Sequence, residues 1–295
     1  MVEHVVVGVD GSTAADAALD WAMERARGVD TRLELLSVVD IDWIPQTGPD
    51  PVEAAHERVL QEALRRVETS GVDVDASTTL RHDRPVPGLV AASRRADLLV
   101  IGSHKSSAVG FVHGTLPLAV AARSRCPLAV VPVDWEPSAG PVLVGLDEES
   151  GGAALDRAAT EAERLDADLL AVRAWSVPLL VSGAWASFEA PLEAFQSAEA
   201  ASMDRMVASL GDRLDGLEVH AVLEHGRPSI VLAEHAARAR LAVVGTHGRG
   251  VVAGILLGSV SHDLLMNLPC PVLVVPPPAA PGREGSIERR GGRED

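Results

Sequence analysis

"HVVVGVDGS" at residues 4–12 is an apolar run typical of a buried strand, and it ends in aspartate and glycine. The chain repeats it as "PVLVGLDEES" at 141–150. Three further pairs recur in one order along the chain: "RPVPGLVAAS" with "RPSIVLAEHA", "ADLLVIGSH" with "ARLAVVGTH", and "CPLAVVP" with "CPVLVVP". Landmarks repeated in the same order indicate two copies of one domain.

Strand-like and helix-like segments alternate within each copy. In the first copy the patterns predict strands near 4–10, 32–39, 74–80, 97–102 and 128–132, and helices near 13–27, 52–70, 86–95 and 115–124. In the second copy they predict strands near 141–147, 168–174, 217–224, 240–245 and 271–275, separated by helical segments. Such alternation builds a parallel sheet with helices on both faces. We therefore predict an α/β fold with two doubly wound five-stranded sheets, in domains at 1–136 and 137–278.

The composition agrees with this fold and argues against several classes of partner. Of the 295 residues 47% are hydrophobic and 3% aromatic, as expected where helices pack on buried parallel strands. The formal net charge of −16 argues against binding to nucleic acid or anionic lipid. No apolar stretch reaches the ~18 residues of a membrane span, so we expect a cytoplasmic protein without a membrane partner. The polar, glycine-rich segment 279–295 is expected to be a disordered tail.

The two cysteines do not indicate a metal or catalytic site. Cys126 and Cys270 lack the spacing of a metal site, and each precedes a proline at the start of an apolar run. We expect both to be buried packing residues, and we expect no metal site built from protein side chains.

A glycine-rich stretch, "VVGTHGRGVVAGILLGSVSHDLL" at 243–265, separates a predicted strand from a predicted helix. Clustered glycine indicates tight turns or a main chain that closely approaches a ligand. The expected first helical turn, from Gly258 to Val260, offers amides without intrahelical acceptors and the positive end of the helix dipole, which favour an anion. A nucleotide triphosphate fits these features, with Ser259 adding a hydroxyl and Arg249 a charge. The alternative is a tight strand-to-helix connection in which Ser259 caps the helix.

The spacing Gly-x2-Gly-x9-Gly-[Ser/Thr], at Gly245, Gly248, Gly258 and Ser259, resembles the nucleotide signature of the universal stress protein family. Together with "VGVDGS" and the duplication, it makes the whole chain, apart from linker and tail, similar to the tandem universal stress proteins common in actinobacteria. The resemblance implies a sheet of order 3-2-1-4-5 in an adenine nucleotide alpha hydrolase-like fold. It also implies an ATP site between the first and fourth strands, with Mg²⁺ or Mn²⁺ as counter-ion.

Carried over residue by residue, the resemblance implies one nucleotide site in each half. The aspartate after the first strand contacts the adenosine, main chain at the end of the second strand holds the adenine, and the glycine loop surrounds the phosphates. In the second half these residues are Asp147, Ala174, Gly245, Thr246, His247, Gly248, Arg249, Gly258, Ser259 and Val260. In the first half they are Asp10, Val39, Gly102, Ser103, Lys105, Gly114 and Thr115.

The first half departs from the family pattern. Lys105 stands where glycine is expected, and only eight residues separate it from Gly114. At a left-handed backbone position lysine would cost on the order of 1 kcal/mol more than glycine, although its amine could instead reach a phosphate.

Simpler interpretations exist for the charged candidates. Asp10 and Asp147 equally suit caps of the helices that follow. His104 and His247 occupy equivalent loop positions, and no partner acid or base is visible for either, so we interpret them as loop residues that line the site. The Walker and Rossmann glycine motifs are absent. We therefore expect no catalytic residues and at most a weak ATPase.

The function implied by the resemblance is that of an ATP-binding regulator of stress or dormancy with little or no hydrolysis, whose state is read by an unknown protein partner. The alternative is an interaction and dimerisation scaffold that needs no nucleotide. The apolar last strands "CPLAVVP" and "CPVLVVP" would be exposed edges unless paired. The resemblance implies that such edges pair across a twofold, so we predict that these two strands pair with each other across a pseudo-twofold within the chain, and the resemblance leaves a homodimer open.

Overall fold

The computed structural model describes residues 2–43, 51–103, 115–147, 151–176, 192–246 and 257–277. The first half contains strands β1 (Glu3–Gly8), β2 (Thr31–Asp40), β3 (Asp75–Asp83), β4 (Leu98–Ser103) and β5 (Leu128–Pro132). Its helices are α1 (Thr13–Ala26), α2 (Pro51–Thr69), α3 (Pro85–Ala92) and α4 (Thr115–Ala121), with a 3-10 turn at Ile41–Trp43.

The second half repeats this order. Its strands are β6 (Val142–Gly145), β7 (Leu169–Trp175), β8 (Val219–His225), β9 (Leu241–Gly245) and β10 (Val272–Val275). Its helices are α5 (Gly151–Leu165), α6 (Leu192–Ala208), α7 (Pro228–Ala236) and α8 (Ser259–Asn267), with a 3-10 turn at Gly211–Gly216. Each predicted strand is present, and its ends differ from the prediction by at most three residues. The predicted domain boundary at 136/137 falls between β5 and β6, and the predicted tail lies outside the described residues.

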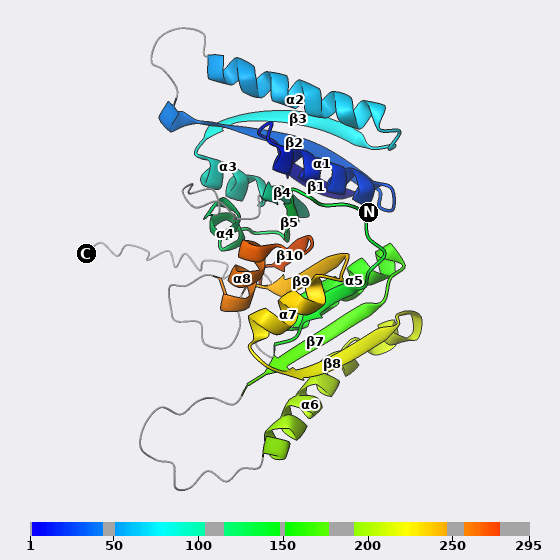
Figure 1. The fold of residues 1–295 in the computed structure, drawn as a ribbon. Helices are drawn as coiled ribbons and strands as arrows, with labels where there is room; N and C mark the ends of the chain where they lie inside the picture. Colours follow the sequence, from blue (N-terminus) through cyan, green and yellow to red (C-terminus); the bar gives the residue numbers. More distant parts are fainter. Residues whose placement is uncertain are drawn as a thin grey trace, which may run out of the picture.

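All ten strands form one sheet, in the order β3-β2-β1-β4-β5-β10-β9-β6-β7-β8 (Figure 1). Each half is parallel and follows the predicted order 3-2-1-4-5. At the centre β5 and β10 run antiparallel, with Val130 opposite Val272. The predicted pairing of the two last strands is therefore confirmed, and it joins the two predicted sheets into one.

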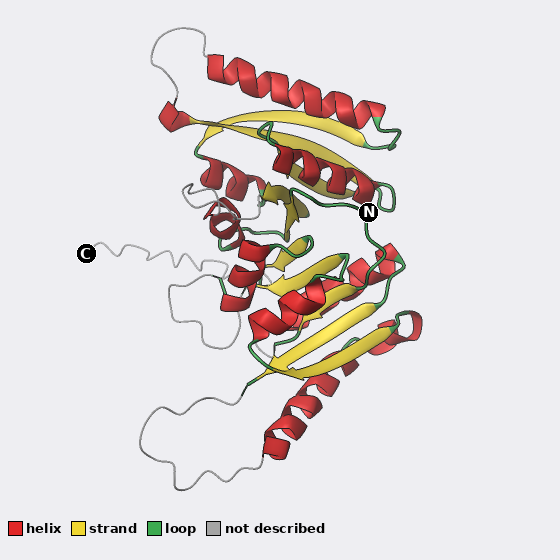
Figure 2. Cartoon of the chain, in the orientation of Figure 1, coloured by secondary structure: helices red, strands yellow, loops and turns green. Residues whose placement is uncertain are grey.

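Helices cover both faces of this sheet, as Figure 2 shows. Side chains alternate between the faces, so that Val5 and Val7 enter one hydrophobic core while Val6 enters the other. The first core is closed by α1, α2, α5 and α6, and the second by α3, α4, α7 and α8. Each core draws on both halves of the chain. Among the described residues, no helix combines the length and the apolar character needed to cross a bilayer.

A buried ionic cluster joins the two halves where α1 and α5 meet. Arg25, near the end of α1, donates to both carboxylate oxygens of Glu161 on α5, at 2.7 and 3.0 Å, and also to Glu3 on β1. Arg157 and Arg164 lie on the same helix as Glu161 and contact its carboxylate at 2.9 and 2.7 Å. The Glu161 side chain is fully buried. We call these five residues the interhalf cluster.

The interhalf cluster shifts the ionisation of its carboxylates. Burial alone would raise the pKa of the Glu161 carboxyl, but the charge of Arg25 and its hydrogen bonds, with the charges of Arg164 and Arg157, hold that pKa at about 2. The pKa of Glu3 is also lowered, because the hydrogen bonds and charge of Arg25 outweigh burial. Both glutamates therefore stay ionised in the folded chain at pH values where the unfolded chain begins to bind protons.

The stability conferred by Glu161 should depend on pH. The folded-state pKa of about 2 lies below the ordinary value of 4.5, so the unfolded chain binds the proton first as the pH falls. The stabilisation is thus complete above pH 4.5 and is lost as the pH falls toward 2. We expect the difference in unfolding free energy between wild type and Glu161→Gln to narrow over this range in denaturant titrations. A difference that stays constant from pH 6 to pH 2 would contradict this assignment.

Candidate functional site

The second half has a topological switch beside β6. This strand pairs with β7 on one side and with β9 on the other. The helix after β6 is α5, on one face of the sheet, and the helix after β9 is α8, on the opposite face. Chain segments that leave neighbouring strands toward opposite faces open a crevice at the carboxyl ends, which is where ligands bind in sheets of this kind.

Two predicted site residues follow these strand ends directly. Asp147 comes two residues after the end of β6 and is half-buried. Thr246 is buried at the end of β9, and its amide donates to the carbonyl of Val275 at 3.1 Å. Because β6 and β9 are adjacent, the structure brings these two segments together at the switch.

The start of α8 is held against the end of β9. The Gly258 amide donates to the Thr246 carbonyl at 2.7 Å, and the Ser261 hydroxyl donates to the Gly245 carbonyl at 2.5 Å. The helix begins at Ser259, and Gly258 is its N-cap in an extended conformation. The alternative interpretation of Ser259 as the N-cap is therefore wrong, because the N-cap is Gly258, one residue earlier. Ser259 is exposed in the first turn, and Val260 follows it half-buried.

Several predicted site residues cannot be placed. His247, Gly248 and Arg249 of the second half, and Lys105 and Gly114 of the first half, lie outside the described residues. So does His104. Their roles stay predictions.

Asp10 does not cap α1. The N-cap of this helix is Ser12, whose hydroxyl accepts from the Ala15 amide at 3.2 Å. Asp10 is exposed, and its carboxylate accepts from the Ser12 amide at 2.9 Å. The capping interpretation of Asp10 is therefore wrong, because a serine two residues later takes that role.

The second strands of the two halves are aligned by their pairing. Gly8 lies opposite Leu36 in β2, and Gly145 lies opposite Val172 in β7. Counted from these pairs, Val39 corresponds to Trp175, and Ala174 corresponds to the residue before Val39. Val39 and Trp175 are both buried, whereas Ala174 is half-buried on the other face. The two main-chain positions predicted to hold adenine are thus one residue out of register with each other.

In the first half, the end of β4 and the start of α4 correspond to the end of β9 and the start of α8, and they differ in detail. A Cβ atom on Gly102 would lie 1.9 Å from the Ala14 carbonyl oxygen, so glycine there is required by the packing of α1 on β4. Ser103 is buried, and its carbonyl accepts from the Val133 amide at 3.1 Å. Thr115 begins α4, which has 7 residues against 9 in α8. Gly102 therefore has a structural reason that does not depend on a ligand.

Sequence reasoning missed a buried ion pair on β7. Arg173 is 3% exposed and pairs with Glu199 of α6, with Nε to Oε2 at 2.7 Å. The equivalent position in β2 is Ser37, which donates to the Val9 carbonyl at 2.7 Å and contacts His56 Nδ1 of α2 at 2.8 Å. Both halves thus join the second strand to the second helix by a polar contact. An arginine within the apolar run "LLAVRAW" was the local signal.

Thiol chemistry is disfavoured at both cysteines. Cys126 and Cys270 are free thiols, and each is 6% exposed. Burial raises the pKa of Cys126 to about 11 and that of Cys270 to about 12, so both stay protonated at neutral pH. The prediction that they are buried packing residues is confirmed.

Known proteins resemble this chain in sequence and in fold. The chain matches the universal stress protein family over residues 1–132 and 139–276. Universal stress protein Rv2005c of Mycobacterium tuberculosis is 33% identical over 290 residues, covering 92% of this chain and 96% of that protein. A universal stress protein from Archaeoglobus fulgidus shares the fold, with a TM-score of 0.68 at 20% identity over 92% of this chain and 98% of its own. A universal stress protein crystallised in complex with cAMP is 26% identical over 44% of this chain and 96% of its own, with a TM-score of 0.37.

Proposed function

Because this chain belongs to the universal stress protein family, we propose that its second half binds ATP and that the bound nucleotide sets a regulatory state in the stress response or dormancy of a cell. The protein acts in the cytoplasm, and an unknown protein partner reads this state. The nucleotide lies in the crevice at the carboxyl ends of β6 and β9.

One observation carries this proposal: the N-terminus of α8 is fixed against the end of β9 at the topological switch. The hydrogen bonds from Gly258 to Thr246 and from Ser261 to Gly245 hold it there. Amides in a first helical turn have no intrahelical acceptors, and the helix dipole adds partial positive charge. This arrangement favours phosphate oxygens even on a chain with a net charge of −16.

Each proposed residue has a role that suits its place. Asp147 accepts hydrogen bonds from the ribose hydroxyls of the adenosine. Main chain near Ala174 and Trp175 contacts the adenine edge. The amides of Ser259 and Val260 and the Ser259 hydroxyl donate to the phosphates. Gly248 and Arg249, which lie outside the described residues, stay predicted phosphate contacts. These donors suit phosphate oxygens rather than a bare cation, so Mg²⁺ or Mn²⁺ would be held by the phosphates themselves.

We expect little or no hydrolysis of the bound ATP. Hydrolysis needs a group that positions or deprotonates the attacking water. Among the described residues proposed for the second-half site, Asp147 alone has a titratable side chain, and its role lies at the adenosine. The nucleotide therefore acts as a bound signal rather than as a substrate that turns over.

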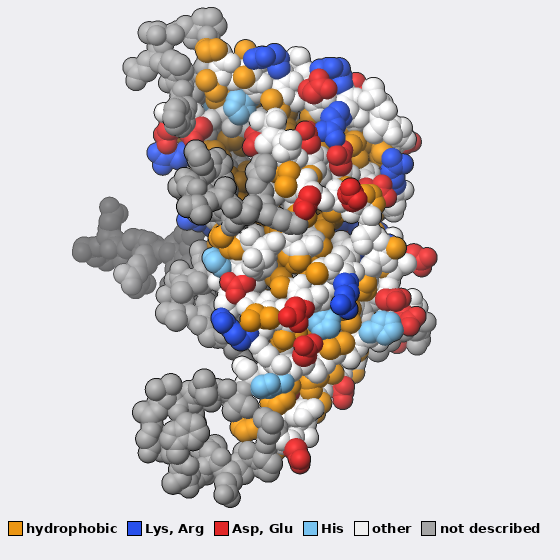
Figure 3. Space-filling model, in the orientation of Figure 1, with side chains coloured by type: hydrophobic (Ala, Val, Ile, Leu, Met, Phe, Trp, Pro, Cys, Tyr) orange, Lys and Arg blue, Asp and Glu red, His pale blue; other side chains and the backbone are white. Residues whose placement is uncertain are grey.

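The general charge distribution fits a small ligand better than a nucleic acid. On the face shown in Figure 3, Lys and Arg side chains of the described residues lie scattered among acidic ones. A nucleic-acid surface would gather its positive charge along one groove or stripe. The affinity for an anionic ligand must then come from local main-chain donors.

The paired substitution Gly258→Glu with Ser259→Asp tests the proposal. It places two carboxylates where the phosphates would lie, so we expect the loss of ATP that copurifies with the wild-type protein and at least about a hundredfold weaker binding, close to 3 kcal/mol. Mass spectrometry of the denatured, purified protein measures the copurified nucleotide. Ser259 is exposed, Gly258 has a φ of −66° that other residues can adopt, and acidic residues suit a helix start, so folding should be retained.

A control adds the same two charges elsewhere in the same half. Ser209→Asp with Gly216→Glu changes exposed positions, and Gly216 has no atom within 4 Å of an added Cβ. This variant should carry as much ATP as wild type. Equal loss in both variants, or unchanged occupancy in the first, would reject the site.

The fold limits the surfaces that the alternative function, an interaction and dimerisation scaffold, could use. The two apolar edges expected to pair across a twofold already pair with each other through β5 and β10. The strands left at the ends of the sheet are β3 and β8, so a homodimer of the whole chain would need a surface other than β5 or β10.

A further inference from the structure

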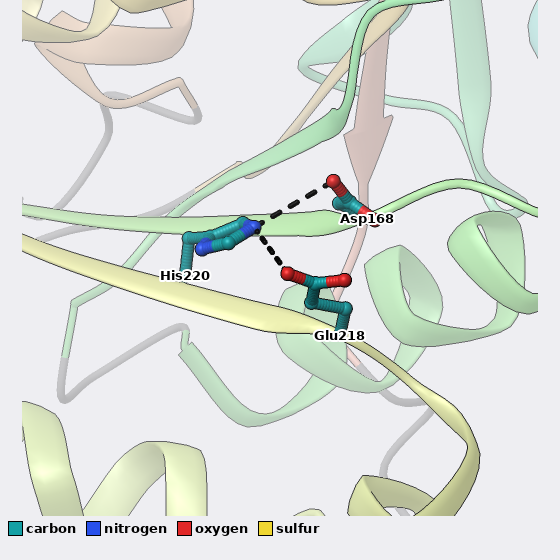
Figure 4. A group of neighbouring side chains, drawn as sticks. All are labelled: Asp168, Glu218 and His220. Atoms are coloured by element: carbon teal, nitrogen blue, oxygen red, sulfur yellow. Dashed lines mark ion pairs between the residues drawn. The ribbon is translucent and has the colours of Figure 1, made fainter.

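Three side chains with metal-binding atoms meet at the amino ends of β7 and β8 (Figure 4). Asp168 immediately precedes β7, Glu218 immediately precedes β8, and His220 is the second residue of β8. This is the end of the strands opposite to the proposed nucleotide crevice. The nucleotide proposal uses none of the three.

Backbone pairing fixes the positions of these residues. The Leu169 amide donates to the Glu218 carbonyl at 2.9 Å, and the Val142 amide donates to the Asp168 carbonyl at 2.9 Å. The parallel register then places Leu170 opposite His220. The backbone that carries the three side chains is therefore ordered without a ligand, so binding has only the side chains left to fix.

The distances fit one metal ion. His220 Nε2 lies 3.3 Å from Glu218 Oε1 and 3.6 Å from Asp168 Oδ2. One ligand atom from each residue lies within 4.8 Å of the others. Zinc bonds to nitrogen and oxygen measure about 2.0–2.2 Å, and two such bonds at a tetrahedral angle put their ligand atoms roughly 3.3–3.5 Å apart. Both distances from His220 are close to that separation.

Against the expectation from the sequence that side chains build no metal site, we propose that Asp168, Glu218 and His220 bind a divalent transition metal of the zinc type. The two carboxylates bring a charge of −2 that the ion neutralises, and a neutral imidazole supplies a nitrogen ligand that Mg²⁺ and Ca²⁺ do not favour. The side chains are 53%, 70% and 51% exposed, so water can complete the coordination. Three protein ligands with an open position are a common zinc arrangement.

The first half provides an internal comparison. The strand pairings make Leu33 of the first half equivalent to Leu169 of the second. Ala76 lies opposite Leu33, and Val219 lies opposite Leu169. Counted from these pairs, the positions of Asp168, Glu218 and His220 hold Arg32, Asp75 and Ser77. A cation stands in place of one carboxylate and a serine in place of the imidazole, so the equivalent positions of the first half lack this ligand set.

Calorimetric titration of the full-length, tag-free protein with Zn²⁺ tests the site. We expect His220→Asn and Asp168→Asn each to weaken binding at one site by about tenfold or more, with nucleotide binding unchanged. The matched control is His235→Asn, which removes a histidine that contacts a single carboxylate, Glu224, at 2.9 Å. This control should bind Zn²⁺ as wild type does.

Two results would overturn the assignment. One is the absence of Zn²⁺ binding by the wild-type protein, which would mean that His220 only pairs with the two carboxylates. The other is an equal loss of binding in all three variants, or in none, which would place any bound Zn²⁺ elsewhere. Because ATP is measured separately, failure of this site leaves the proposed function standing.

Discussion

Replacing Glu161 with glutamine is expected to lower the free energy of unfolding by about 3–5 kcal/mol, the loss typical when one partner of a buried ion pair is removed. The carboxylate of Glu161 is fully buried and is contacted by Arg25, Arg157 and Arg164. A glutamine of the same shape would leave these three cations around a neutral amide. Its NH₂ group would also face guanidinium donors in place of an acceptor.

This loss should weaken the contact between the halves in particular. Arg25 belongs to α1 of the first half, whereas Glu161 belongs to α5 of the second. The antiparallel pairing of β5 with β10 holds the halves together in the sheet, and the interhalf cluster holds them together on one helical layer. Hydrogen exchange should therefore show faster exchange in α1 and α5 of the variant than in α2 and α6.

Glu163→Gln is the control for this prediction. Glu163 lies on the same helix and pairs with Arg213 at 2.8 Å, but its side chain is 42% exposed. Exposed ion pairs contribute about 1 kcal/mol or less, so urea denaturation should give nearly wild-type stability. Equal losses for Glu161→Gln and Glu163→Gln would mean that the interhalf cluster contributes no more than a surface pair.

Gly102→Ala is expected to destabilise the protein by about 3 kcal/mol or more, at or beyond the upper end of the usual cost of overpacking a core. The added Cβ would lie 1.9 Å from the Ala14 carbonyl oxygen and 2.2 Å from the Ala14 carbonyl carbon. Both atoms are main chain of α1, so no side-chain rotation can relieve the contact. The helix must move away from β4 or the strand must bend.

The matched control is Gly152→Ala in the first turn of α5. No atom lies within 4 Å of a Cβ added there, and alanine favours a helix over glycine. Thermal or urea unfolding should show no loss for this variant. If Gly102→Ala proved as stable as wild type, α1 would not approach β4 as closely as the structure has it.

The fold could be predicted from the sequence because its signals are local and occur twice. Runs such as "VVVG" and "VLVG" are typical of buried strands between amphipathic helices, and such runs occur in the same order in each half. The join between β5 and β10 could also be predicted, because apolar last strands would be exposed edges unless paired and the family resemblance implies that such edges pair across a twofold. These inferences needed no knowledge of distant contacts.

The contacts between distant charges could not be predicted in the same way. Arg25 and Glu161 are 136 residues apart in the sequence. A charged residue on an amphipathic helix is ordinarily predicted to lie on the solvent-exposed face. Asp168 and Glu218 likewise become neighbours only through the pairing of β7 with β8. Of the candidate site, the strand ends could be located to within two residues and the start of α8 to within one. The sequence offered Asp10 as a cap of α1, and only the hydrogen bonds show that Ser12 takes that role.

Amides at the switch point of the second half are proposed to bind the phosphates of ATP. Isothermal titration of the wild-type protein with ATP and Mg²⁺ tests this claim most directly, with Gly258→Glu plus Ser259→Asp measured alongside. We expect saturable heat for at least one ATP per chain in wild type and its loss in the variant. No heat from wild type at millimolar ATP, or the same heat from both proteins, would contradict it.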